Sequence, residues 1–213
     1  MKHAVDWTLY LVTDRALAKG RPLSWVVEEA VRGGVTAVQL REKDCPTREF
    51  VEIAGEMKRM LDGHGVPLII NDRVDVALAV GADGVHIGQA DMPYRAVRRL
   101  VGKKMLIGLS VETPAQADEA ESLDASYLGV SPIFITPTKA ELRTAWGLEG
   151  LKKLRARSRH KLIAIGGINE SNAAGVIRAG ADGIAVVSAI CAANDPRQAA
   201  AQLRQTIEQA RAL

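Results

Sequence analysis

Three polar side chains stand at alternate positions where an apolar run ends. Gln39, Arg41 and Lys43 occupy the end of the segment 37–40 and the residues after it. In an extended chain alternate residues point to the same side, so an amide and two cations converge. We expect these groups to hold an anionic ligand.

A hydroxyl-rich sequence ending in a lysine follows another apolar run, 125–130. Thr136, Pro137, Thr138 and Lys139 lie in the loop 131–146 that comes directly after it. α/β proteins commonly hold phosphorylated ligands with loops placed just past a strand. The sequence therefore predicts that this loop binds a phosphate group.

Two aspartates follow neighbouring apolar runs and could hold one hard divalent cation. Asn71 and Asp72 follow the run 68–70, and Asp91 comes after the run 84–87. Magnesium binds to one or two carboxylates and takes its other ligands from water and substrate phosphates. The alternative is that Asp72 caps a helix and Asp91 belongs to a turn.

The last two apolar runs also end in residues that could bind a phosphate. The seventh run ends in Gly166 and Gly167. The eighth ends in Val187 and Ser188, and a short apolar segment follows at 189–193. Glycines expose backbone N–H groups, and a short extra helix after the eighth strand is a common phosphate site of barrel enzymes. The alternative is that the glycine pair only forms a tight turn.

Two more polar residues are weaker candidates. Ser110 ends the run 105–109 and could belong to a helix cap, whereas His86 lies inside a run and is interpreted as a satisfied core group without a proton-transfer role. The scattered tryptophans and tyrosines are interpreted as packing residues.

Short apolar runs alternate with longer amphipathic stretches eight times, which predicts a strand and a helix in each unit. The predicted strands are 8–12, 37–40, 68–70, 84–87, 105–109, 125–129, 162–165 and 183–187. The predicted helices are 23–32, 47–64, 72–80, 94–101, 114–122, 148–157, 170–179 and 196–212.

This repetition favours a single (β/α)8 TIM barrel with its active site at the C-terminal ends of the strands. Strands buried on both faces read as continuous apolar runs, as they do here. An open doubly wound sheet is the alternative, but no Gly-x-Gly-x-x-Gly opens a first helix. We expect one catalytic domain over residues 1–213.

Composition narrows the possible partners and compartments. The net charge of +3 is too small to indicate nucleic acid or an anionic membrane as a partner. Cys45 and Cys191 are too few for a disulfide framework, and no run is long and apolar enough to span a membrane. We expect a cytoplasmic protein that acts on small molecules, and the sequence leaves its oligomeric state open.

An ordered set of segments resembles the thiamine-phosphate synthase family, also called thiamine-phosphate pyrophosphorylase, almost from end to end. The segments are LYLVTDR (9–15), QLREK (39–43), INDRVDVALAVGADGVHIGQ (70–89), GLSVET (108–113), YLGVSPIFITPTK (127–139), AIGGI (164–168) and VVSAI (186–190). Each segment alone is weak evidence for the family, whereas the whole set in this order is highly specific for it.

The resemblance implies an enzyme that joins 4-amino-2-methyl-5-hydroxymethylpyrimidine diphosphate to 4-methyl-5-(2-hydroxyethyl)thiazole phosphate, giving thiamine phosphate and diphosphate. It implies that Asp72 and Asp91 hold Mg²⁺. The implied contacts of the pyrimidine diphosphate are Gln39, Leu40, Arg41, Glu42, Lys43, Asn71, Ser110 and Lys139. Those of the thiazole phosphate are Thr136, Thr138, Gly167, Val187 and Ser188.

The chemistry implied by the resemblance is dissociative, so diphosphate leaves before the thiazole nitrogen attacks and no general base is required. We expect Arg41, Lys43, Ser110 and Lys139 to be the catalytic residues, with the cations neutralising charge on the leaving diphosphate. The bulky loop after Lys139 could close over the site and exclude water.

Three alternatives remain. A TenI-like thiazole tautomerase or regulator would bind thiazole phosphate without needing the cations of the diphosphate half. A non-catalytic sensor would bind the same ligand and form no product. A phosphosugar epimerase or isomerase would need a carboxylate or histidine for carbon-acid chemistry, and only His86 and Glu112 are spare.

Overall fold

The computed structural model describes residues 5–135 and 145–212, which form a closed barrel of parallel strands in sequence order. β1 pairs with β8 and so completes the closure. The strands are β1 (Leu9–Val12), β2 (Ala37–Leu40), β3 (Leu68–Asn71), β4 (Gly84–Ile87), β5 (Leu106–Val111), β6 (Tyr127–Val130), β7 (Leu162–Ile165) and β8 (Gly183–Val186). The predicted (β/α)8 barrel is confirmed.

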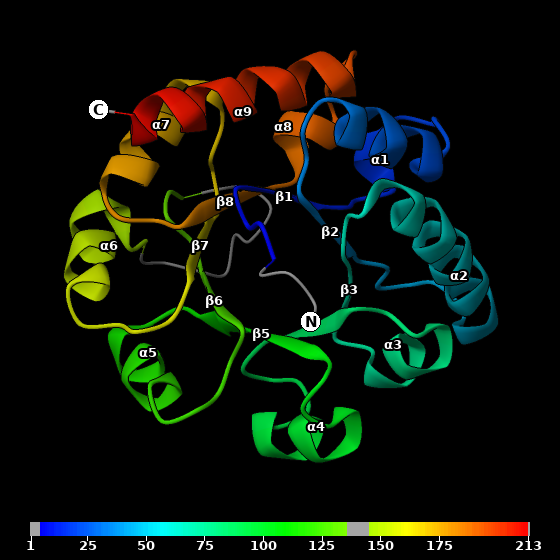
Figure 1. Ribbon diagram of the computed structural model, residues 1–213, viewed down its shortest axis with the longest axis horizontal. Helices are drawn as coiled ribbons and strands as arrows, with labels where there is room; N and C mark the ends of the chain where they lie inside the picture. The colour runs from blue at the N-terminus through cyan, green and yellow to red at the C-terminus, as the bar shows by residue number, and fades with distance from the viewer. Residues whose placement is uncertain (1–4, 136–144, 213) are drawn as a thin grey trace.

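Helices surround the barrel on the outside, as Figure 1 shows in a view along the barrel. They are α1 (Leu23–Arg32), α2 (Thr47–His64), α3 (Val74–Val80), α4 (Tyr94–Val101), α5 (Pro114–Ala120), α6 (Gly147–Arg155), α7 (Glu170–Arg178), α8 (Ser188–Cys191) and α9 (Pro196–Arg211), with a 3-10 turn η1 (Ala16–Ala18). In the described part of the chain no helix is long and apolar enough to cross a membrane.

Each strand buries both faces, and its alternate residues enter two different apolar layers. Tyr10 and Val12 of β1 pack inside the barrel, whereas Leu9 and Leu11 pack between the barrel and the helices. The same alternation places Gln39 of β2 on the inner side. The inward positions near the C-terminal ends therefore line the barrel mouth.

Two element boundaries differ from the prediction in ways that affect the site. α3 begins at Val74 instead of 72, because Asp72 has a left-handed backbone with φ 62° that a helix cannot contain. β5 extends to Val111, so Ser110 lies inside a strand and does not belong to a helix cap. The cap of α5 is Thr113, which forms a capping box with Gln116.

Candidate active site

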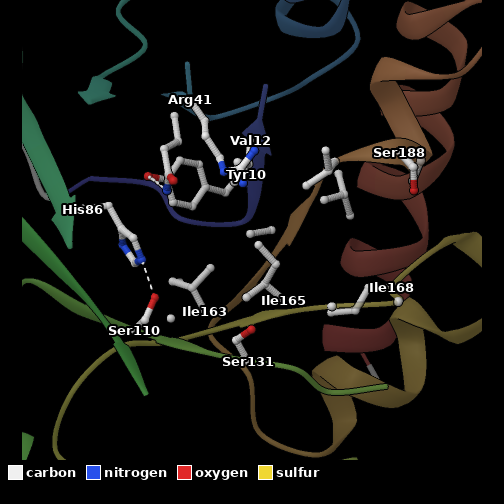
Figure 2. Close-up of a pocket in the computed structure, with 18 of the residues that line it drawn as sticks. Tyr10, Val12, Arg41, His86, Ser110, Ser131, Ile163, Ile165, Ile168 and Ser188 are labelled. Atoms are coloured by element: carbon white, nitrogen blue, oxygen red, sulfur yellow. Dashed lines mark hydrogen bonds between the residues drawn. The ribbon is translucent and has the colours of Figure 1, made fainter. Parts of the chain in front are cut away.

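A cavity of about 440 Å³ opens at the C-terminal ends of the strands, where the sequence predicted the active site. Side chains from both halves of the barrel face it (Figure 2). Its polar lining includes Asp14, Gln39, Arg41, Asn71, His86, Ser110, Ser131, Asn169 and Ser188. Its apolar lining includes Val12, Ile135, Ile163, Ile165, Ile168, Ala185, Val186 and Val187.

One wall combines the polar residues predicted from strand ends β2, β3 and β5. Gln39, Arg41, Asn71 and Ser110 all line the cavity, which brings together groups that lie up to three strands apart. The backbone N–H of Arg41 donates to Thr13 Oγ1 at 3.0 Å, which fixes the chain where it leaves β2. Of the three groups predicted to converge, Gln39 and Arg41 line the cavity and Lys43 does not.

The opposite wall is apolar and contains the predicted glycine turn. Gly166 and Gly167 follow β7 with φ of 104° and 66°, and Val187 and Ser188 begin the short helix α8. A Cβ on Gly167 would lie 2.9 Å from Phe134 Cβ, so the turn packs directly on the segment after β6. Glycine is needed here for both backbone conformation and space.

The two predicted metal ligands are neighbours. Burial, together with the interaction of its carboxyl with that of Asp91, raises the pKa of Asp72 to about 6, so the two carboxyl groups lie close to each other. The positive charge of Lys43 opposes this rise. Asp91 also accepts a hydrogen bond from the backbone N–H of Gly88 at 2.6 Å, which orients its carboxylate.

Two neighbouring carboxylates can bind a cation, because its positive charge reduces the repulsion between them. In the described residues no group of three or more His, Cys, Asp or Glu side chains could hold a metal. A pair of acids fits Mg²⁺, which takes its remaining ligands from water and substrate phosphates. The alternative that Asp72 caps α3 is wrong, since the residue before that helix is Arg73.

Among the members of the predicted substrate set that the structure describes, Leu40, Glu42 and Lys43 do not line the cavity. Leu40 is fully buried in the layer under the helices, so its side chain cannot reach a ligand in the cavity. Glu42 forms a salt bridge with Arg15 at 3.1 Å, and its side chain is only 7% exposed. Lys43 is exposed, and its charge acts on Asp72 at the rim.

The remaining predicted residues, Thr136, Thr138 and Lys139, lie outside the described residues, as does most of the loop predicted to close over the site. Their roles stay predictions.

Sequence reasoning missed the aromatic floor of the cavity. Tyr10 and Tyr127 were interpreted as packing residues only, but both line the cavity and their hydroxyl oxygens are 2.8 Å apart. The available signal was their inward position on β1 and β6, which alternation assigns to the barrel interior. His86, expected to be a satisfied group, contacts Tyr127 and Ser110 through its two ring nitrogens.

The raised pKa of Asp72 leads to a prediction for stability without divalent cations. Well below pH 3.8 its carboxyl is protonated in both the folded and the unfolded protein. As pH rises from 3.8 to about 6 the unfolded protein loses this proton and the folded protein keeps it, so stability falls across that window and the loss is complete above about pH 6. We expect Asp72→Asn to be more stable than the parent above pH 7, by on the order of 1 kcal/mol after solvent screening. Below pH 4 the difference should vanish.

Urea denaturation in EDTA at several pH values measures this difference. Asp75→Asn is the matched control, since the Arg73 guanidinium lowers the pKa of Asp75 and its replacement should bring no gain at high pH. An Asp72→Asn gain that is equal at pH 4 and pH 8 would contradict the electrostatic origin.

The fold and the cavity together define a (β/α)8 barrel whose described cavity is lined by the cation Arg41 and by several hydroxyl groups at the C-terminal ends of the strands. A family profile described as "Thiamine monophosphate synthase" matches residues 9–190. A thiamine-phosphate synthase of Albidiferax ferrireducens is 56% identical over 94% of this chain and 91% of its own length. One of Chloroflexus aurantiacus is 53% identical over 96% of this chain and 94% of its own length.

A solved thiamine phosphate pyrophosphorylase from Pyrococcus furiosus superposes with a TM-score of 0.90 at 41% identity, covering 97% of this chain and 98% of that one. The chain belongs to the thiamine-phosphate synthase family, and its enzymatic class is that of a transferase.

Proposed function

We propose that the chain joins 4-amino-2-methyl-5-hydroxymethylpyrimidine diphosphate to 4-methyl-5-(2-hydroxyethyl)thiazole phosphate, releasing diphosphate and forming thiamine phosphate. One observation carries the proposal. A single cavity combines a polar wall at β2, β3 and β5 with an apolar wall and glycine turn at β7 and β8. The two walls suit two substrates of different chemistry, and both substrates are small molecules.

The polar wall is assigned to the pyrimidine diphosphate. Gln39 and Ser110 offer hydrogen-bonding groups to the ring. Asn71 interacts with Asp72, and Arg41 follows β2, the neighbour of the strand that ends at Asn71, so the diphosphate would lie on this side. Arg15 neutralises Glu42 and so removes a negative charge that would repel this substrate. Lys43 and Lys139 would add positive charge from the rim.

The apolar wall is assigned to the thiazole phosphate. Ile163, Ile165 and Ile168 provide a surface for the thiazole ring (Figure 2). Gly167, Val187 and Ser188 bring backbone N–H groups and a hydroxyl to the same end of the cavity, where a phosphate would bind. Thr136 and Thr138 complete this set in the proposal.

Asp72 and Asp91 would hold Mg²⁺, which when bound supplies positive charge that stabilises the departing diphosphate. Arg41 contributes to the same stabilisation from the cavity wall. As the carbon–oxygen bond to diphosphate breaks, the electron pair leaves with the diphosphate, and the aminopyrimidine stabilises the cation that remains. The thiazole nitrogen then supplies the electron pair of the new carbon–nitrogen bond.

The site protects such a cation from water and needs no general base. The three isoleucines place hydrocarbon next to the reacting carbon, which limits attack by solvent. His86 contacts protein groups through both ring nitrogens, consistent with a structural role. We also infer that residues 1–213 act as one catalytic domain, since the described strands share one closed sheet.

A coupled assay with both substrates, with and without Mg²⁺, tests the proposal. Equimolar, metal-dependent formation of thiamine phosphate and diphosphate is the expected result. Binding of thiazole phosphate without turnover would instead favour a TenI-like protein or a sensor.

Gly167→Ala should weaken the thiazole phosphate half selectively. The new Cβ would press on Phe134 and displace the turn, so we expect the KM for thiazole phosphate to rise about tenfold, as for the loss of one hydrogen bond to a charged group. The KM for the pyrimidine diphosphate should stay unchanged. Steady-state kinetics with each substrate varied in turn measures both constants.

Gly65→Ala is the matched control, because Gly65 at the end of α2 has φ 68° and a Cβ added there would have no atom within 4 Å. It should share the backbone strain and leave both KM values unchanged. Equal effects of Gly167→Ala on the two KM values would contradict the assignment of this wall.

A further inference from the structure

A continuous line of hydrogen bonds crosses the floor of the cavity from β2 to β5. Gln39 Nε2 donates to Tyr10 Oη at 3.0 Å, Tyr10 Oη lies 2.8 Å from Tyr127 Oη, and Tyr127 Oη lies 3.0 Å from His86 Nδ1. His86 Nε2 then lies 2.9 Å from Ser110 Oγ (Figure 2). We call these five residues the floor relay. All of them line the cavity.

The barrel interior is shaped to hold this relay. A Cβ on Gly108 would overlap the Tyr127 phenol and lie 2.5 Å from His86 Nδ1, and a Cβ on Gly129 would lie 3.0 Å from His86 Cε1. Trp7 packs against Tyr127 from below, with ring centroids 4.4 Å apart. Two inward glycines and one tryptophan thus fix the positions of the two central rings.

Both phenols stay protonated at neutral pH. Burial raises the pKa of Tyr10 and of Tyr127 well above the usual value of 10. Each hydroxyl therefore has one hydrogen to donate, and leaving a buried donor without an acceptor is costly. Each of the two hydroxyl hydrogens therefore needs an acceptor within the relay.

This requirement gives the relay a direction. The amide nitrogen of Gln39 can only donate, so Tyr10 accepts from it and donates its own hydrogen to Tyr127. Tyr127 then donates to His86 Nδ1, and His86 carries its proton on Nε2 and donates to Ser110. The reverse order would direct Tyr127 toward Tyr10 and leave the Tyr10 hydrogen without an acceptor in the relay.

We propose that the floor relay presents two complementary groups to the ligand: the Ser110 hydroxyl as a donor and the Gln39 carbonyl oxygen as an acceptor. Tyr10, Tyr127 and His86 act as positioning residues through these two. An aminopyrimidine matches this pattern, because its ring nitrogens accept hydrogen bonds and its amino group donates them. The ligand match rests on the proposed function, whereas the direction of the relay does not.

The first test needs no substrate. Nitrogen-15 NMR of the ligand-free protein, with the His86 ring signals assigned through its own backbone, reports which ring nitrogen carries the proton. A proton on Nε2 is the expected result, and in Tyr127→Phe the two tautomers should mix. A proton on Nδ1 of the parent protein would overturn the direction, whatever the enzyme assay shows.

The second test is a double-mutant cycle between Tyr127→Phe and Ser110→Ala. Tyr127→Phe should lower kcat/KM for the pyrimidine diphosphate on the order of tenfold. It should leave the KM for thiazole phosphate unchanged. In the Ser110→Ala background its further effect should be smaller, because the part that Tyr127 exerts through His86 on Ser110 is already lost and only the part through Tyr10 and Gln39 remains.

Tyr94→Phe is the matched control, since the Tyr94 hydroxyl donates to Asp124 at 2.7 Å on the outer helix α4 and does not contact the cavity. It should lower stability without changing kinetics. Additive losses in the cycle would overturn the coupling between Tyr127 and Ser110. Failure of all variants and the parent to turn over would instead reject the proposed function and leave the NMR result to decide the relay.

Discussion

Arg41→Met is expected to lower kcat by about 10²–10³-fold, the effect of removing one group that stabilises developing charge in an enzyme site. Arg41 lines the cavity and follows β2, the neighbour of β3, beyond which Asp72 lies; the proposed function places the departing diphosphate and its growing negative charge here. Methionine keeps much of the length and hydrocarbon of the side chain and removes its charge. Turnover at saturating concentrations of both substrates measures the loss.

Arg73→Met provides the control, because Arg73 lies two residues past the end of β3 but its guanidinium is committed to Asp75 at 2.6 Å and to Thr47. Its kcat should stay within about twofold of the parent, as for an exposed ion pair of small energetic value. A kcat of Arg41→Met equal to the parent's would contradict the placement of the diphosphate beside Arg41.

Asp91→Asn should raise the Mg²⁺ concentration for half-maximal activity about 10–100-fold, at least as much as losing an outer-shell partner of a metal site. Asparagine keeps an oxygen that can accept the hydrogen bond from the Gly88 N–H, so the loop geometry should survive. The charge of one of the two metal ligands is lost. Titration of turnover with Mg²⁺, together with calorimetric binding of Mg²⁺ in the presence of diphosphate, measures the shift.

Asp118→Asn is the matched control. Asp118 lies on the outer helix α5, pairs with Arg157 at 3.0 Å and is not part of the cavity. Its Mg²⁺ dependence should equal the parent's. An unchanged half-maximal concentration for Asp91→Asn would place the metal elsewhere.

Hydrophobic patterning predicted the barrel because every strand is buried on both faces and every unit repeats the same order. The strands Ala37–Leu40, Gly84–Ile87 and Leu162–Ile165 have the predicted boundaries. Several other boundaries differ by one or two residues, and two of the differences concern site residues, Asp72 and Ser110. Helix α3 starts late because Asp72 adopts a left-handed conformation, which local helical preference did not anticipate.

Alternation along single strands was sufficient to predict the polar wall. The prediction that Gln39 and Arg41 share one side needed only the two-residue period of an extended chain, continued from β2 to the residue after it. The pairing of Asp72 with Asp91 followed from the rule that adjacent parallel strands end at the same edge, and in the structure the two carboxyl groups lie close enough for Asp91 to raise the pKa of Asp72. Leu40 is different, because its outward position places its side chain in the core under the helices.

The sequence by itself determined the barrel class, the edge at which the site forms and the polar residues of one wall, since these depend on spacing along one strand or its neighbour. The tertiary structure alone decided which inward side chains meet across the barrel. Tyr10 and Tyr127 lie 117 positions apart and touch only because closure brings β1 and β6 to one interior. Spacing along the chain carries no information about such contacts, which depend on how the closed sheet staggers its strands.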